Sequence, residues 1–202
     1  MKTLLGARAG IVAAAILLVS CVSTRVDGRR VDPSRDPLGY ESVLVFCDAS
    51  DESIRETVER AVSAQIDRRG LAATPSLDVL VEPRGYSEDE VFSLLLDRGE
   101  DALIRVAVED FSSEVAEYPG GAWMYWGPCG PGVAYEPPTT SSRSYLTLTV
   151  EVVDASSRRV VWRGDASSST PGIDRLPRLA EAVGSRLVDV LRRDHVVTPR
   201  RR

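Results

Sequence analysis

The chain has 202 residues, of which 43% are hydrophobic and 27% are charged, as in an ordinary globular domain rather than a disordered chain. Its formal net charge is -5 and becomes -7 when Lys2 and Arg8 are removed with the N-terminal segment described next. Binding of nucleic acid requires a basic surface, so this acidic balance argues against a nucleic-acid partner.

The first 20 residues have the pattern of a signal peptide. Lys2 and Arg8 provide a positively charged start, and residues 11–19 form an apolar run that is too short to span a bilayer stably. We therefore expect residues 1–20 to be removed. The alternatives are an uncleaved N-terminal helix and an ordinary secreted protein with an unrelated cysteine.

Residues 18–21, at the end of this segment, read Leu-Val-Ser-Cys. This sequence resembles the lipobox of bacterial lipoproteins, which implies cleavage before Cys21, diacylglyceryl modification of its thiol and acylation, for example with palmitate, of its new amino group. Val22 stands where an aspartate would resemble an inner-membrane retention signal, which favours the outer membrane with the protein facing the periplasm. Two or three acyl chains would form a durable anchor to the membrane.

The mature chain divides into three segments. Residues 21–40 are expected to form a lipidated flexible tether, because the sequence after Cys21 lacks apolar periodicity and contains Gly, Pro, Ser and charged residues. Residues 41–197 should form one α/β domain. Residues 198–202 form a short basic tail, which could contact anionic lipid or glycan but is more typical of a frayed end.

Apolar runs typical of buried strands alternate with amphipathic stretches typical of helices in the first half of the domain. In chain order we expect a strand at 43–47, a helix from a capping box at 53–56 to Gly70, a strand at 71–74, a helix at 87–98 and a strand at 101–110. This βαβαβ order predicts parallel strands joined by right-handed crossovers.

The sequence of the second half of the domain predicts a hairpin followed by a helix. Residues 145–153 alternate between apolar and polar side chains, residues 154–158 form a turn, and residues 159–166 form the return strand. A C-terminal helix follows, with apolar residues three or four positions apart from Leu176 to Leu191. The expected fold class is therefore α/β: a βαβαβ unit, a β-hairpin and a C-terminal helix, with helices packed on a single mixed sheet.

This arrangement resembles a group of small α/β lipoproteins of the bacterial envelope. The resemblance rests on residues 43–47, 68–71, 102–108 and 160–164, which carry the first strand, the end of the first helix, the third strand and the return strand of the hairpin. The group includes penicillin-binding-protein activators, curli-secretion lipoproteins and the amino-terminal domain of TolB. Its members mostly bind or assemble other proteins, so the resemblance implies interaction rather than catalysis.

Residues 112–144 interrupt the regular pattern and are expected to form a long loop rich in Gly and Pro. Five aromatic residues make this segment the best candidate for a binding site: Tyr118, Trp123, Tyr125, Trp126 and Tyr135. Their flat faces could fill the pockets of a protein partner or stack on sugars. Alternatively, they could fold back over the sheet and complete the core.

Two cysteines remain once Cys21 is assigned to lipid. Cys47 ends an apolar strand and Cys129 lies in the Gly/Pro segment, and a disulfide between them could persist in an oxidising compartment. The alternative is that they are free cysteines that pack as small hydrophobic residues.

The sequence gives little sign of catalytic, metal or cofactor chemistry. The single histidine, His195, lies close to the C-terminus rather than in a central loop. Asp48, Asp51 and Glu52 could supply oxygen ligands, but acidic residues are also favoured at the start of the helix that follows them. We therefore expect no catalytic residues, no metal site and no cofactor.

These patterns predict a non-catalytic, membrane-anchored envelope lipoprotein that binds a protein partner through the aromatic segment or a sheet edge. The alternatives are an oligomeric assembly or secretion-channel component and a protein that binds cell-wall glycan through the same rings. An enzyme is the least favoured class.

Overall fold

The computed structural model describes residues 22–31, 38–80, 86–128 and 130–198. The expected signal peptide, the lipidation residue Cys21, the cysteine Cys129 and most of the basic tail lie outside the described residues.

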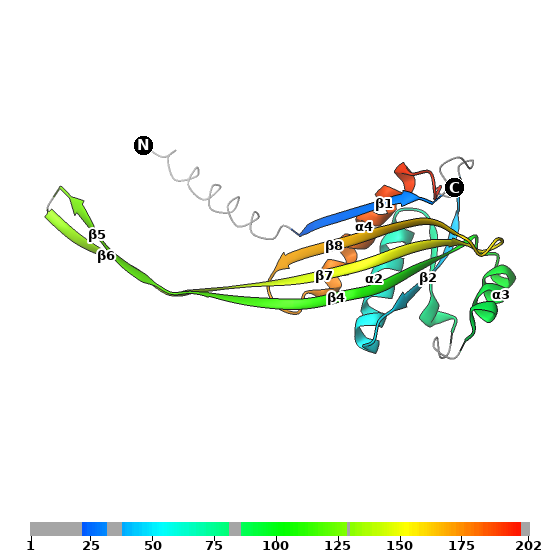
Figure 1. Ribbon diagram of the computed structural model, residues 1–202, viewed down its shortest axis with the longest axis horizontal. Helices are drawn as coiled ribbons and strands as arrows, with labels where there is room; N and C mark the ends of the chain where they lie inside the picture. Colours follow the sequence, from blue (N-terminus) through cyan, green and yellow to red (C-terminus); the bar gives the residue numbers. More distant parts are fainter. Residues whose placement is uncertain (1–21, 32–37, 81–85, 129, 199–202) are drawn as a thin grey trace, which may run out of the picture.

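Six strands form one mixed sheet in the order β1-β8-β7-β4-β2-β3 (Figure 1). Strand β2 runs parallel to β3 and β4, whereas the pairs β4–β7, β7–β8 and β8–β1 are antiparallel. The bounds of the strands are β1 Ser23–Arg30, β2 Ser42–Asp48, β3 Ala72–Pro75, β4 Ala102–Tyr118, β7 Thr139–Asp154 and β8 Val160–Pro171. The expected α/β class with a single main mixed sheet is confirmed.

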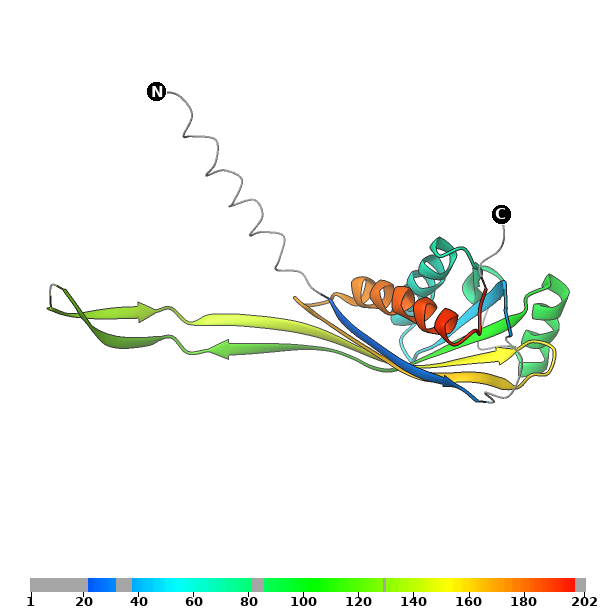
Figure 2. The same ribbon diagram turned by 90° about the horizontal axis from the view of Figure 1, so that it is seen from above.

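Helices α2 (Glu52–Arg68) and α4 (Leu176–Arg193) pack side by side on one face of the sheet (Figure 2). Their apolar faces meet the alternate residues of β2 and β7 that point toward them, and together these form the main core. Helix α3 (Glu88–Arg98) covers the end of the opposite face, where Phe92 and Leu95 pack against Leu44 and Leu103. A short 3-10 helix, η2 (Ser76–Asp78), follows β3.

The alternation of apolar and polar residues in β7 places its apolar side chains on one face of the sheet, as expected. Leu146, Leu148, Val150 and Val152 are fully buried on the face covered by helices, because successive side chains of a strand point to opposite faces. The C-terminal helix likewise buries its apolar stripe. The hairpin of β7 and β8 is therefore confirmed, as are the strands and helices of the first half, with small shifts at most of their ends.

The large buried residue Trp162 of β8 fixes the position of β1. A Cβ atom on Gly28 would lie 2.0 Å from the Trp162 ring, so only glycine allows β1 to pass over this ring. The indole Nε1 donates a hydrogen bond of 2.9 Å to the carboxylate of Asp194, which follows α4. Trp162 thus joins an edge strand, the sheet and the C-terminal helix.

The prediction of a flexible tether over residues 21–40 is wrong for residues 23–30. These residues form β1, which pairs antiparallel with β8 from Ser23 opposite Ser169 to Arg30 opposite Trp162. Only Val26 in this strand is buried and apolar, so the sequence has no hydrophobic alternation that would reveal it. Backbone hydrogen bonds to β8 stabilise the strand instead.

The start of α2 also differs from the expected capping box at 53–56. Asp51 caps the helix, and its carboxylate accepts hydrogen bonds from the backbone N–H groups of Ser53 and Ile54. The capping box that begins α3 is confirmed, with Ser87 and Glu90 as its two members.

Candidate interaction site on the hairpin arm

We call the six-stranded sheet as far as residues 111 and 145, together with the helices packed on it, the head of the molecule. A long β-hairpin extends from the head, which corrects the prediction of a loop over residues 112–144. Strands β4 and β7 stay paired as far as Tyr118 opposite Thr139. Strands β5 (Gly121–Gly127) and β6 (Gly130–Glu136) then continue the hairpin. We call residues 112–118 with 139–144 the shaft, β5 with β6 the tip, and shaft and tip together the arm (Figure 1).

Proline and glycine separate the shaft from the tip. Pro119 on one strand and Pro137 with Pro138 on the other lack a backbone N–H, which interrupts the ladder of hydrogen bonds. The two strands approach closely here, because a Cβ on Gly120 would lie 2.3 Å from the Glu136 carbonyl oxygen. Such residues are typical of loops in a sequence, whereas here they lie at a break between two β-ladders.

The outer part of the arm consists of two strands only. Strand β8 ends at Pro171 opposite Arg143, and β2 ends at Asp48 opposite Ala107. From Val115 to Gly127 no third strand of the described residues therefore lies beside the arm, over a length of about 40 Å at about 3.3 Å per residue. Both edges of this ribbon present backbone groups that can pair with another strand.

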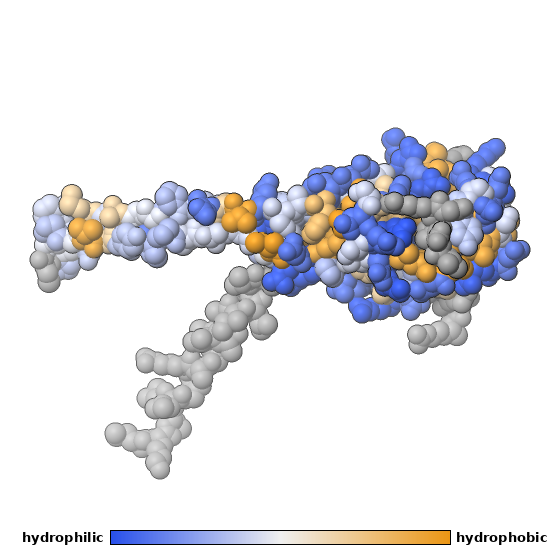
Figure 3. All heavy atoms as spheres, turned by 90° about the horizontal axis from the view of Figure 1, so that it is seen from below, coloured by the Kyte–Doolittle hydropathy of each residue, from blue (hydrophilic) through white to orange (hydrophobic). Residues whose placement is uncertain are grey.

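The two faces of the tip are both apolar. One face carries Ala122, Met124 and Trp126 opposite Tyr135, Val133 and Pro131. The other carries Trp123 and Tyr125 opposite Ala134 and Gly132. The Tyr125 ring lies over Gly132, where a Cβ would approach it to 2.7 Å. On the face seen in Figure 3, the end of the arm is mostly pale with some orange and has little of the deep blue that marks strongly hydrophilic residues.

All five aromatic residues expected to form the binding site lie on the arm and are exposed. Trp126 is 84% exposed and Tyr135 70%, and Tyr118, Trp123 and Tyr125 are each more than half exposed. The alternative that these rings complete the core therefore does not hold. Met124, which is 80% exposed, and Val133 belong to the same surface. Sequence reasoning missed both, although they lie in the same uncharged segment as the aromatic residues, which is the signal that could have revealed them.

Cys47 is a free thiol buried in the core, which corrects the suggested disulfide with Cys129. Gly127 and Gly130, which pair across the end of the hairpin, lie at the far end of the arm from β2 (Figure 1). Burial, followed by the charge of Glu59, raises the pKa of the Cys47 thiol to about 12. The thiol is therefore protonated at neutral pH and behaves as a small hydrophobic residue.

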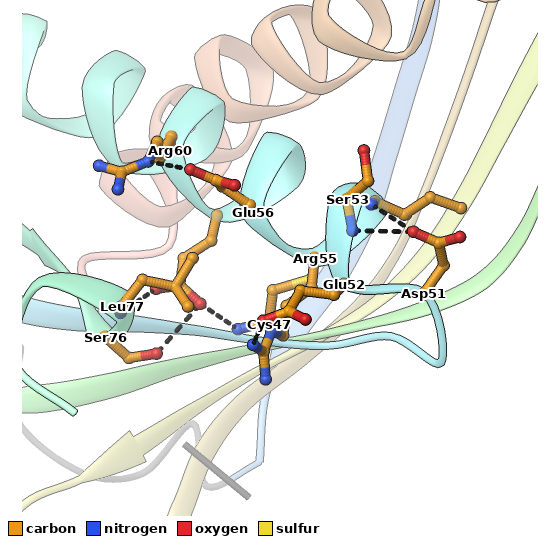
Figure 4. A network of polar contacts seen from close by, with 11 residues as sticks. Cys47, Asp51, Glu52, Ser53, Arg55, Glu56, Arg60, Ser76 and Leu77 are labelled. Atoms are coloured by element: carbon orange, nitrogen blue, oxygen red, sulfur yellow. Dashed lines mark hydrogen bonds and ion pairs between the residues drawn. The ribbon is translucent and has the colours of Figure 1, made fainter. Parts of the chain in front are cut away.

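A buried carboxylate beside Cys47 is the centre of a polar cluster in the head. Glu59 of α2 is fully buried and accepts hydrogen bonds from the Cys47 N–H at 3.0 Å, the Ser76 hydroxyl at 3.0 Å and the Leu77 N–H at 2.7 Å (Figure 4). Burial raises the pKa of Glu59, against the opposing effect of these hydrogen bonds and of Arg55. The cluster joins α2, β2 and η2, and we assign it a structural role.

The other residues considered for chemistry lie apart from the arm. His195 is exposed in the turn after α4 and has a left-handed backbone with φ of 55°. Asp51 is occupied as a helix cap, and Glu52 contacts Arg55. Across the described part of the chain, the acidic, His and Cys side chains form no group of three that could hold a metal ion.

Comparison with known proteins identifies the family. The sequence profile of the domain of unknown function DUF4136 matches residues 41–187, which is most of the chain. The chain belongs to the DUF4136 family. This assignment supersedes the narrower resemblance to penicillin-binding-protein activators, curli-secretion lipoproteins and the TolB domain. A search of curated proteins found no match.

The solved structures that resemble this DUF4136 protein have low sequence identity to it. The PelC dodecamer from Paraburkholderia phytofirmans has a TM-score of 0.50 and 12% identity, covering 88% of this chain and 100% of that chain. The lipoprotein GNA1162 from Neisseria meningitidis has a TM-score of 0.44 and 15% identity, covering 75% of this chain and 98% of that chain. Among the described residues of the DUF4136 protein, none of the helices has the length and apolar character needed to cross a bilayer.

Proposed function

We propose that this DUF4136 protein is a non-enzymatic, lipid-anchored protein of the bacterial envelope that assembles with further copies of itself through the shaft of its arm. Cys21 is the proposed lipidation site. The proposal favours assembly over a monomeric binding module, which was the leading interpretation of the sequence alone.

The observation that carries this proposal is the two-stranded arm. An isolated pair of strands is only marginally stable in water, and a third strand or a packed helix is normally needed to support it. Val115, at the middle of the shaft, is an apolar residue that is 53% exposed. A neighbouring copy beside the shaft would cover Val115, and a strand of that copy would pair with one free edge of the shaft.

The fold comparison supports the same interpretation. The PelC structure that shares this fold is a dodecamer. An assembly of this kind needs a surface on one copy that complements a surface on the next, and the exposed edges of the shaft provide such a surface.

The residues gathered on the arm favour binding over catalysis. Its tip presents aromatic and aliphatic side chains. Such side chains contribute strongly to protein interfaces, whereas the His, Asp, Glu and Lys side chains that most often act as general acids and bases are absent from residues 118–135. This supports the non-enzymatic part of the proposal.

Site-specific photo-crosslinking in cells tests the proposed assembly. A photoreactive amino acid is placed at Val115 and, as a control, at Leu96 on α3, which is 52% exposed and equally apolar. We expect crosslinked dimers and larger multiples of the chain from position 115 only. Adducts with a different protein would instead favour the binding-module alternative, and absence of adducts at position 115 would contradict an interface on the shaft.

The anchor requires a separate test. Mass spectrometry of the N-terminal peptide should detect acyl chains on Cys21, and the Cys21→Ser variant should be released from the membrane fraction. An unmodified peptide that retains residues 1–20 would contradict the anchor.

A further inference from the structure

The tip of the arm has a composition unlike the rest of the molecule. Charged residues make up 27% of the chain, yet the only charged residue in the strands of the tip is Glu136, at the end of β6 next to the shaft. From Tyr118, the last residue of β4, to Tyr135 the sequence contains no Asp, Glu, Lys, Arg or His. The same segment contains two of the three tryptophans and three of the six tyrosines. Trp and Tyr are the residues enriched where a protein meets the interface between lipid and water.

Apolar side chains are exposed on both faces of the tip, which indicates contact with lipid rather than with the surface of a protein. An antiparallel sheet that packs on one partner has one apolar face and one polar, solvated face. Here Met124, Trp126, Val133 and Tyr135 form one apolar face, while Trp123 and Tyr125 project from the other. A flat protein partner would cover only one of these faces, whereas a lipid layer surrounds both.

The position of β1 brings the tip within reach of the membrane. Ser23, the first residue of β1, lies opposite Ser169 of β8, near the end of the sheet from which the arm extends (Figures 1 and 2). Cys21 precedes Ser23 by two residues, a distance of about 7 Å at most. The acyl chains proposed at Cys21 would therefore hold the root of the arm close to the membrane surface.

The backbone of the tip limits the depth of insertion. Strands β5 and β6 pair with each other but have free outer edges. Unpaired backbone groups are costly in hydrocarbon, so a single hairpin with open edges does not cross it. Trp, Tyr and Met side chains can instead enter the interfacial layer while the backbone edges contact lipid headgroups and water.

We infer that the tip is a second membrane contact, which inserts its aromatic side chains into the interfacial layer of the bilayer that holds Cys21. This inference rests on the proposed lipid anchor for its geometry. The arm starts near the surface, and its two-stranded part from Val115 to Gly127 alone is about 40 Å long, so the tip reaches this layer when the arm is inclined along the membrane.

Fluorescence quenching of the tryptophans tests the inference. The lipidated protein is reconstituted into vesicles of phosphatidylethanolamine and phosphatidylglycerol, with and without bromine atoms on the acyl chains, which quench fluorescence on contact. Trp123 and Trp126 are at the tip, whereas Trp162 is fully buried in the head and supplies a constant background. We expect brominated lipid to quench the tip tryptophans, and the quenching to disappear in the Trp123→Phe, Trp126→Phe double variant.

A matched pair of variants with an added charge tests insertion of the tip without changing any of the three tryptophans. Val133→Asp places a charge in the tip, whereas Leu96→Asp places one on α3, and both parent residues are exposed and apolar. We expect quenching by brominated lipid to be lost in Val133→Asp and retained in Leu96→Asp. Retained quenching in both variants would contradict insertion of this face of the tip.

The remaining outcomes separate lipid from other environments. Quenching of the tip tryptophans by aqueous iodide but not by brominated lipid would place the tip in water. Protection from both quenchers would place it against protein. Either result would overturn the inference. The mass of the Cys21 peptide is measured on the same sample, so that loss of the anchor and loss of tip insertion are recorded independently.

Discussion

The carboxylate of Glu59 on α2 lies 3.0 Å from the backbone nitrogen of Cys47 on β2 and accepts its hydrogen bond in the interior of the head. The other oxygen accepts the N–H of Leu77 at 2.7 Å. A single side chain therefore satisfies backbone donors from two elements that would otherwise lack a partner there. This relationship explains how a fully buried carboxylate is tolerated in a core that is mostly apolar.

Replacement of this carboxylate should destabilise the head. Glu59→Ala leaves the N–H groups of Cys47 and Leu77 without acceptors, and we expect the free energy of unfolding to fall by about 2–4 kcal/mol. Glu56→Ala on the same helix removes only an exposed ion pair with Arg60, and should cost at most about 0.5 kcal/mol. Urea unfolding of both variants measures the difference, and equal effects would show that the buried hydrogen bonds contribute little.

The packing of Trp162 under β1 makes a second prediction. Gly28→Ala forces a methyl group into the Trp162 ring, and we expect a loss of about 1–3 kcal/mol in unfolding free energy. Gly121→Ala is the control, because a Cβ there has no heavy atom within 4 Å. Thermal unfolding compares the two. A neutral Gly28→Ala would imply that β1 is not held against β8 in solution.

Cys47 should be chemically inert in the folded protein. Its thiol is buried and its pKa is raised to about 12, so very little thiolate forms at pH 8. In a chain with Cys21→Ser and Cys129→Ser, we expect iodoacetamide to label Cys47 only after the protein is unfolded in urea. Rapid labelling without urea would show that this part of the core opens readily.

The turn between β7 and β8 should make the free energy of unfolding depend on pH below about pH 4. Burial opposes ionisation of Asp154, but hydrogen bonds from Tyr40, Ser157 and Ser156 outweigh it and lower its pKa to about 2. Because the folded pKa lies below the unfolded value of about 3.9, this stabilisation is present above pH 4 and is lost as the pH falls through 2.

The contribution of Asp154 is limited by its partial exposure. After allowance for screening by solvent we expect about 1 kcal/mol. The difference in unfolding free energy between the parent protein and Asp154→Asn should therefore shrink between pH 4 and pH 2. A difference that stays constant over this range would contradict the assigned hydrogen bonds.

Much of the head could be predicted from the sequence because its elements follow clear patterns. The apolar run of β2, the strict alternation of β7 and the apolar stripe of α4 each indicate both the type of element and the face that it buries. Strand β1 could not be predicted in this way, because only Val26 is buried and Gly28 is present for contact with Trp162 rather than for a turn.

The sequence predicts a loop over residues 112–144 instead of the strands of the arm, also because hydrophobic alternation is missing there. These strands have no core to face, so they lack the apolar and polar alternation on which strand prediction depends. Gly120, Pro119 and Pro137 suggested a loop, although they mark a break between two ladders. The five aromatic residues all lie on the arm, and their role in binding stays a prediction. Their exposure depends on the length of the hairpin, which only the structure reveals.

Assembly through the shaft is the central claim, and native mass spectrometry of the mature protein after gentle detergent extraction tests it most directly. We expect a defined multiple of the chain mass that does not change on dilution. Val115→Glu should reduce this mass to that of the single chain, while Leu96→Glu, at a matched exposed position on α3, should leave it unchanged. A parent protein that is a single chain at every concentration would contradict the account.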